Sequence, residues 1–251
     1  MVTSKLNDVN GLVINELKYG NTSKIITVFT SEIGIIKIMC QGAYRKNSPL
    51  ASLTNKYSFV NYNLNKGKNF YYIIDGESLE NNFYLTNSLK LVTVSGLMTE
   101  LLEKTLVPEN PEPEIYGLIK TFFKVLKENP DKVEVLLLSV LVKYSSFVGY
   151  RPNLNGCIRC GDKNSNYYII DENAGGAICS ECKFNNGSKI SKDELVYLTR
   201  LLYLPMADNL DRSTESIDHR QLTRNMLGFI IKNLEIQDLK ITKWLESAKL
   251  I

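Results

Sequence analysis

The chain has 251 residues, of which 44% are hydrophobic and 23% are charged, and its formal net charge is +3. This length predicts two or three compact units, and the apolar content is sufficient for real cores. No stretch approaches the roughly 20 consecutive apolar residues that span a bilayer, which excludes a helical membrane protein. The N-terminal sequence MVTSKLNDVNG lacks the basic and apolar regions of a secretory signal, so we expect a cytoplasmic protein.

Positive charge is concentrated in the first part of the chain. Residues 1–80 contain nine Lys and Arg against six Asp and Glu, whereas residues 81–150 have a net charge of −1 and residues 151–251 of +1. A local excess of cations favours a polyanionic partner for the N-terminal region.

Five segments within residues 1–80 have the alternation or the β-branched content of strands. Short turns join them, except for a longer polar link at Gln41–Asn55 that has room for one helical turn. This spacing predicts a five-stranded β-barrel of the OB type, and an SH3-like barrel fits the same pattern. The expected strands are residues 11–19, 24–30, 35–40, 56–64 and 70–75.

From about residue 87 the hydrophobic pattern changes to the period of helices. Lys132–Val148 is apolar on nearly every side, which predicts a central buried helix. Ser191 followed by Glu194 three residues later is typical of a capping box at the start of a helix. We therefore expect a barrel domain at 1–80 and an all-α domain at 81–251. The expected helices are 88–107, 115–129, 132–148, 191–205, 219–233 and 241–248.

Four cysteines form two Cys-x-x-Cys pairs, Cys157 with Cys160 and Cys179 with Cys182, and eighteen residues separate the pairs. This spacing is within the range of four-cysteine zinc sites, and a reducing compartment favours metal ligands over disulfides. The residues between the pairs are typical of a short hairpin, so we predict a zinc ribbon inserted into the helical domain at about 150–190. Unpaired thiols and an iron–sulfur cluster are the alternatives.

The expected zinc ion, one per chain, is structural. A catalytic zinc ion usually keeps a position open for water, whereas here four thiolates complete the tetrahedron. The chain's only histidine, His219, lies outside the cysteine segment. We expect the metal to stabilise a segment that has almost no apolar core of its own. The fifth cysteine, Cys40, lies in an apolar strand and is expected to be a small buried hydrophobic residue.

No motif in the sequence indicates an enzyme. Neither a Gly-rich phosphate-binding loop nor a Gly-x-Ser-x-Gly sequence is present. The prediction is a protein without catalytic activity, and a metalloenzyme with an unrecognised site is an alternative.

The N-terminal region contains candidates for DNA contact. Arg45 and Lys46 follow Tyr44 directly after the third expected strand, and two more lysines lie in the turn before the fifth. Cations bind phosphates and aromatic faces stack on bases, which is the combination that single-strand binding requires. Solvated surface side chains are the alternative for each. The candidates are Lys24, Lys37, Arg45, Lys46, Lys66 and Lys68.

Three places along the chain resemble the RecO family of bacterial recombination mediators. The first is residues 11–46, with Gly42-Ala43 followed by basic residues. The second is GYRPNL at 149–154 leading into the first cysteine pair, and the third is the second cysteine pair at 179–182.

This resemblance implies an N-terminal OB barrel, a helical domain with a zinc module, and no catalytic turnover. It also implies binding of single- and double-stranded DNA and annealing of complementary strands. With RecR, such proteins help load RecA onto DNA coated by single-strand-binding protein, and they associate with the nucleoid when they act on DNA. The alternative is a protein–protein adaptor whose zinc-bearing helical domain docks repair partners and which binds DNA only weakly.

Overall fold

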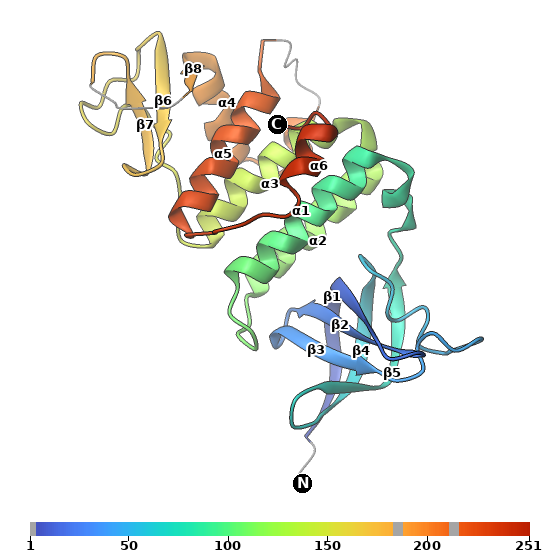
Figure 1. The fold of residues 1–251 in the computed structure, drawn as a ribbon. Coiled ribbons are helices and arrows are strands. Elements are labelled where there is room, and N and C mark those ends of the chain that lie inside the picture. Colours follow the sequence, from blue (N-terminus) through green and yellow to red (C-terminus); the bar gives the residue numbers. More distant parts are fainter. Residues whose placement is uncertain (1–3, 183–187, 211–215) are drawn as a thin grey trace. The chain divides into compact units, whose positions relative to one another are not determined.

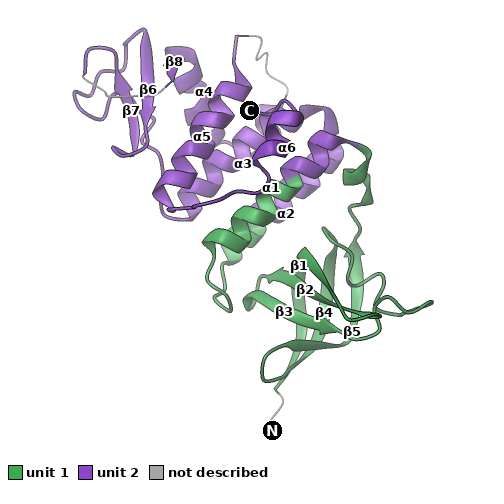
Figure 2. Cartoon of the chain, viewed as in Figure 1, with its two compact units in different colours: residues 1–87, 95–117 green, residues 88–94, 118–251 purple. Residues whose placement is uncertain are grey.

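A computed structural model describes residues 4–182, 188–210 and 216–251 (Figure 1). The chain divides into two compact units (Figure 2). Unit 1 consists of residues 1–87 and 95–117, and unit 2 consists of residues 88–94 and 118–251. Among the described residues, no helix is both long enough and apolar enough to cross a membrane.

Unit 1 contains a five-stranded sheet. Strand β1 pairs antiparallel with β2 and β4, β2 pairs with β3, and β4 pairs with β5. One parallel pair, Ile38 with Tyr71, joins β3 to β5, so the pairings connect the strands in the closed order β1-β2-β3-β5-β4. The strands are β1 (Lys5–Tyr19), β2 (Ser23–Thr30), β3 (Gly34–Cys40), β4 (Phe59–Lys66) and β5 (Tyr71–Glu80).

The core of this sheet is formed by alternate residues of each strand, as the period of two requires. Val28, Ile38 and Leu64 are completely buried in it, and the buried Tyr62 hydroxyl donates a hydrogen bond to the Leu53 carbonyl at 2.6 Å. Cys40 is 1% exposed, which confirms its prediction as a buried residue.

All five expected strands are present, but two of them are longer than predicted. Strand β1 begins at Lys5 rather than Gly11, and β5 ends at Glu80 rather than Asp75. The additional residues are mostly polar and exposed, so pairing of their backbones rather than a buried face makes them strands. The link at 41–55 forms a series of turns and contains no helix.

Six α-helices lie after the sheet, and α1 and α2 contribute residues to both units. In unit 2, α3 packs against α4 and α5, and its buried residues lie on all sides, which confirms the predicted central helix. The helices are α1 (Leu89–Thr105), α2 (Pro113–Glu128), α3 (Val133–Phe147), α4 (Lys192–Tyr203), α5 (His219–Asn233) and α6 (Thr242–Ser247). Short 3₁₀ turns are η1 (Phe83–Asn87), η2 (Pro130–Lys132) and η3 (Ala207–Asn209).

Side chains form hydrogen bonds with the backbone groups at both ends of α4. At its start, the Glu194 amide donates to Ser191 Oγ at 3.2 Å and the Ser191 amide donates to Glu194 Oε2 at 2.8 Å, which confirms the capping box. At its other end, Lys143 Nζ of α3 donates to the Leu202 and Leu204 carbonyls at 3.1 and 2.6 Å. These contacts fix α4 in unit 2.

The cysteine segment contains a three-stranded sheet in the order β7-β6-β8. Strands β6 (Tyr167–Asp171) and β7 (Gly176–Cys179) form the predicted hairpin. Strand β8 (Lys189–Ser191) was not predicted, because three residues are too few to show an alternating pattern. It pairs with β6 and leads directly into α4, which joins this sheet to the helices (Figure 1).

Candidate metal centre and nucleic-acid interface

The four cysteine sulfurs of the two Cys-x-x-Cys pairs lie together in unit 2, all within 4.8 Å of one another. Cys157 Sγ is 3.7 Å from Cys182 Sγ, and Cys160 Sγ is 3.5 Å from Cys179 Sγ. A tetrahedron of thiolates with metal–sulfur bonds of about 2.3 Å has edges of about 3.8 Å. The four cysteines are thus placed where they can hold one metal ion.

Local backbone hydrogen bonds set the positions of these sulfurs. The Cys157 amide donates to the Asp162 carbonyl at 2.7 Å, and the Gly161 amide donates to the Cys157 carbonyl at 2.8 Å. Gly161 has a φ of +79°, a conformation that favours glycine. In the second pair, the Cys182 amide donates to the Cys179 carbonyl at 3.1 Å. Each Cys-x-x-Cys turn therefore directs two thiols to the same point.

The thiols differ in their acidity. Burial acts to raise the pKa of Cys157, but hydrogen bonds from the backbones of Cys179, Cys160 and Arg159 outweigh it and lower the pKa to about 6. The pKa of Cys182 is raised to about 12, chiefly by its side-chain hydrogen bond with Cys160. All four thiols are free of disulfides. A thiolate is the form that binds metal, and the lowered pKa of Cys157 favours that form.

The cysteine segment has more apolar core than the sequence predicts. Tyr168, Ile169 and Ile178 are at most 1% exposed, as is Ile190 of β8. The expectation of almost no apolar core is therefore wrong, because β8 extends the sheet beside β6 and the helices α4 and α5 pack against it. A metal ion bound by the four cysteines would add to this packing.

Among the candidate DNA-binding cations, Lys24 is buried. Its side chain is 6% exposed, and its Nζ donates to Glu16 Oε2 at 2.8 Å and to the Thr54 carbonyl at 2.7 Å. The ammonium also lies 5.4 Å from the centre of the Tyr44 ring. This placement argues against the predicted DNA contact, because two of the three ammonium donors are already used and the third has little access to solvent.

The other five cations are exposed, and they lie in two regions and on one strand. Arg45 and Lys46 belong to the turns that follow β3, and Lys37 lies on β3 itself. Lys66 and Lys68 lie at the β4–β5 turn, where Lys66 Nζ forms an ion pair with Glu109 at 2.6 Å.

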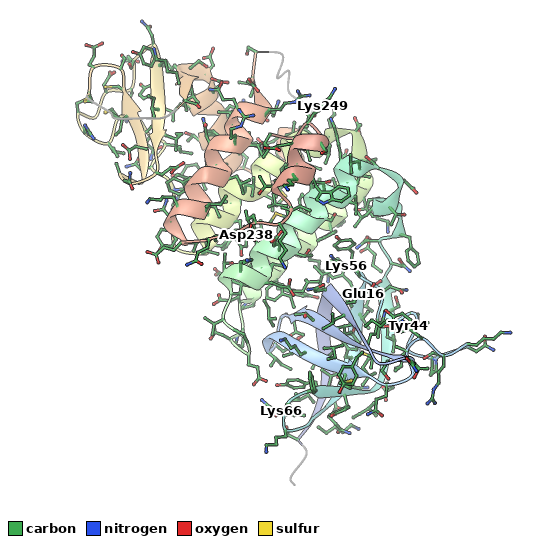
Figure 3. The ribbon with its side chains drawn as sticks, viewed as in Figure 1. Glu16, Tyr44, Lys56, Lys66, Asp238 and Lys249 are labelled. Carbon is green, nitrogen blue, oxygen red and sulfur yellow. The ribbon has the colours of Figure 1, made fainter. Side chains whose placement is uncertain are left out.

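Tyr44 and Lys66 are at different places on the sheet (Figure 3). The turn that contains Tyr44 thus lies apart from Lys66.

An exposed aromatic residue that was not predicted as a contact lies near Tyr44 in unit 1. Tyr19 ends β1 and is 55% exposed, and Tyr44 is 49% exposed. The Tyr44 amide donates to the carbonyl of Thr22, in the β1–β2 turn, at 2.9 Å, so the two segments lie side by side. The position of Tyr19 beside an expected hairpin turn was the sequence feature that could have predicted its exposure.

His219 does not form a recognisable catalytic arrangement. Its Nε2 is 3.0 Å from the Tyr197 hydroxyl, and burial lowers the pKa of the imidazole. Burial also raises the pKa of Tyr197 to about 12, so this hydroxyl stays protonated. In the parts of the chain that the structure describes, His219 has hydrogen bonds with the Tyr197 phenol and the Ile217 backbone, and neither is an activated nucleophile.

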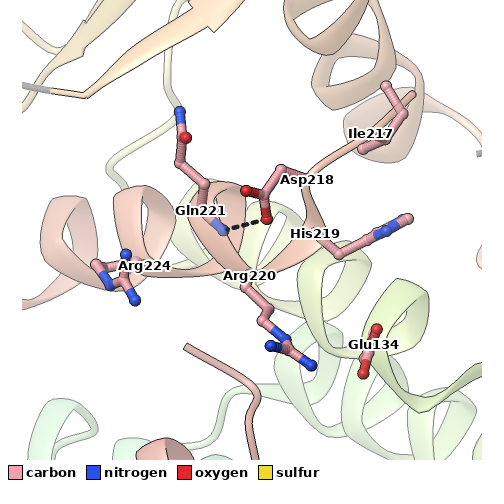
Figure 4. A pocket seen from close by; sticks show the side chains of 7 residues that line it. All are labelled: Glu134, Ile217, Asp218, His219, Arg220, Gln221 and Arg224. Atoms are coloured by element: carbon pink, nitrogen blue, oxygen red, sulfur yellow. Dashed lines mark hydrogen bonds between the residues drawn. The ribbon is translucent and has the colours of Figure 1, made fainter. Parts of the chain in front are cut away.

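A pocket of about 500 Å³ lies beside His219, at the start of α5 (Figure 4). Its lining has both acidic and basic side chains, including Glu134, Asp218, Arg220 and Arg224. Asp218 caps α5 by accepting a hydrogen bond from the Gln221 amide at 3.0 Å, and Glu134 forms an ion pair with Lys90 of α1. The carboxylates near His219 thus stabilise helices.

Comparisons with known proteins agree with this architecture. Residues 6–82 match the family model of the recombination protein O N-terminal region, and residues 87–234 match that of the C-terminal region. A DNA repair protein RecO of Bacillus pumilus is 31% identical over 173 residues, which are 68% of this chain and 66% of that protein.

Two further DNA repair proteins RecO align along nearly the whole chain. That of Caldicellulosiruptor saccharolyticus is 25% identical over 241 residues, 95% of this chain and 97% of that protein. That of Oceanobacillus iheyensis is 27% identical over 247 residues, 93% of each. Because both family models match in chain order and together cover most of the residues, this chain belongs to the RecO family of DNA repair proteins.

Proposed function

We propose that this chain is a DNA repair and recombination mediator without catalytic turnover. It binds single- and double-stranded DNA through the sheet of unit 1 and anneals complementary strands. With RecR it helps RecA replace single-strand-binding protein on single-stranded DNA, in the cytoplasm and at the nucleoid. The observation that carries the proposal is the exposed Tyr44-Arg45-Lys46 turn beside β3.

The strand order supports an OB-type barrel for unit 1. A closed order β1-β2-β3-β5-β4, with a parallel contact between β3 and β5, is the connectivity expected of a five-stranded Greek-key barrel. OB folds bind oligonucleotides on the face of strands 2 and 3 and on the β1–β2 and β4–β5 loops. Tyr19 flanks the first of these loops, Lys37 lies on β3, and Lys66 and Lys68 lie at the second loop.

The proposed DNA-binding residues are therefore fewer than the sequence predicts. They comprise cations that reach solvent, with the two exposed tyrosines as stacking surfaces. Lys24 is left out, because its ammonium is buried against Glu16 and Thr54. The proposed cations are Lys37, Arg45, Lys46, Lys66 and Lys68.

We assign the DNA-binding domain to 1–80 and the helical domain to 81–251, with a zinc module at about 150–190. Cys157, Cys160, Cys179 and Cys182 would hold one zinc ion per chain, and their sulfur separations suit a tetrahedral ion. A closed four-thiolate site leaves no position for a reacting water. The ion would link the segment before β6 to the end of β7.

The second candidate function is a protein–protein adaptor that binds DNA weakly. One observation favours it: Lys24 and Lys66 are both ion-paired within unit 1, which reduces the positive charge available to phosphates. In that case the helical domain binds repair partners without the help of residues 1–80.

A salt titration distinguishes the two functions. Binding of a fluorescent oligo-dT is measured between low and moderate salt for the full chain and for the Arg45→Ala, Lys46→Ala double variant. For single strands, the slope of log K against log salt is negative, and each lost phosphate contact reduces its magnitude by about 0.7. The double variant should therefore reduce the magnitude by about 1.4.

The matched control is Lys120→Ala with Lys124→Ala, two exposed lysines of α2. It should leave the slope unchanged. An unaltered slope in the Arg45, Lys46 variant would contradict direct DNA binding by this turn and favour the adaptor.

A further inference from the structure

A groove in unit 2 is lined by basic and apolar residues that have no part in the proposed function. One wall is a single face of α4, where residues recur at intervals of three and four. The other wall is the segment that leads into the first cysteine pair, and Thr199 Oγ1 joins the walls by donating to the Leu154 carbonyl at 3.1 Å. The volume is about 370 Å³, and the lining residues are Leu154, Asn155, Gly156, Lys163, Lys192, Leu195, Val196, Thr199 and Arg200.

All the charged side chains that line this α4 groove are basic. Lys192 and Arg200 lie about 12 Å apart along the helix, at a rise of about 1.5 Å per residue, and Lys163 lies on the facing wall. No carboxylate is among the described residues that line the groove. Asp193 is next to Lys192 but is not part of the lining, and Glu194 is occupied by the Ser191 cap.

Two cations of the groove have donors that form no hydrogen bond to the described residues. Lys192 Nζ donates to the Asn164 side chain at 2.9 Å, which uses one of three donors. The Nη2 atom of Arg200 is buried without a hydrogen-bond partner among the described residues. A buried donor without a partner is unfavourable, so a hydrogen bond to an acceptor oxygen is favoured there.

Between the cations the groove is apolar. Leu154 and Leu195 are 3% and 4% exposed and form its floor, while Val196 is 51% exposed at its side. A ligand that matches this pattern has a row of anions and also apolar faces. A single-stranded nucleic acid has both, whereas a duplex keeps its base faces stacked inside. Cations about 12 Å apart along the groove can contact phosphates at separate positions of one strand.

We propose that the α4 groove binds the backbone of single-stranded nucleic acid, as a second site in unit 2. This inference rests on the proposed function, and it explains how one chain can hold two strands, which annealing requires. Lys163, Lys192 and Arg200 contact phosphates, and the Val196 side chain contacts a sugar or base.

Photo-crosslinking in the full-length protein tests the groove. Val196 is replaced by p-benzoylphenylalanine, and radiolabelled oligo-dT is crosslinked and quantified. The same replacement at Trp244, which is 56% exposed on α6, is the control position. We expect crosslinking at 196 to exceed that at 244 several-fold.

Adding Lys163→Ala and Lys192→Ala should reduce the crosslink at 196 several-fold. Lys232→Ala with Lys243→Ala, two exposed lysines outside the groove, should leave it unchanged.

Each result has a defined meaning. Equal crosslinking at 196 and 244, in a protein that binds oligo-dT through Arg45 and Lys46, overturns the groove and leaves the proposed function intact. A protein that does not bind oligo-dT at all overturns both. The competing ligand is tested with a fluorescent peptide of alternating Asp and Leu residues. If this peptide binds and depends on Lys163 and Lys192 while the oligo-dT crosslink does not, the groove is a peptide site and the proposal is wrong.

Discussion

Replacing Lys24 by methionine should destabilise unit 1 without directly changing how it binds DNA. The substitution keeps the length of the side chain and removes the ammonium that bonds to Glu16 and to the Thr54 carbonyl. The Thr54 carbonyl then loses a buried hydrogen bond, at a cost of about 1–3 kcal/mol. The ion pair adds little, about 0–1 kcal/mol, because the Glu16 side chain is 39% exposed and solvent screens it. We expect a loss of about 1–4 kcal/mol.

Lys37→Met is the matched control for this prediction. Lys37 is exposed on β3, so its replacement should change the free energy of unfolding by about 0.5 kcal/mol or less. Urea unfolding followed by circular dichroism measures both stabilities. In a salt titration with oligo-dT, Lys37→Met should reduce the magnitude of the slope of log K against log salt by about 0.7. Lys24→Met should leave this slope unchanged. A stable Lys24→Met protein with a reduced salt slope would refute our account of Lys24.

Three further predictions concern other parts of the chain. Cys157→Ser should reduce bound zinc, measured by mass spectrometry, from about one ion per chain to near zero, and full retention would contradict the four-thiolate site. The lowered pKa of His219 means that its protonation favours the unfolded state. Stability should therefore fall as the pH drops below about 6.5, and His219→Gln should weaken that dependence in urea titrations; an identical pH profile would show that another group is responsible. Gly34→Ala should destabilise by about 1–3 kcal/mol in thermal unfolding, because Gly34 has a φ of +85° and the Asn110 backbone fills the space of a Cβ. Gly20→Ala also has positive φ but has open space around it, so it should cost less.

Elements with a strong local pattern were predictable. The five strands and most of the helices have a hydrophobic period, α3 is apolar on nearly every side, and the Ser191 capping box has a fixed spacing. The cysteine cluster was predictable for the same reason, since a Cys-x-x-Cys turn places two sulfurs within one local bend. Strand β8 was missed, because three residues become a strand only through hydrogen bonds to a distant partner.

The role of individual cations was less predictable. Lys24 and Lys37 both lie on strands, and nothing in their local sequence separates them. Only the fold brings Glu16 and Thr54 to Lys24, and Glu109 to Lys66. A surface lysine and a buried one thus look alike until long-range contacts are known.

Periodicity, spacing and short motifs are local properties, so the amino-acid sequence alone was enough to predict the order of the longer elements, the four cysteines of the candidate metal centre and the family. The tertiary structure decided which cations reach solvent, which residues cover the cysteine hairpin, and that Lys163 lies across a groove from Lys192 and Arg200. These properties depend on residues that are far apart along the chain. Burial and charge complementarity exist only after the backbone has brought such residues together.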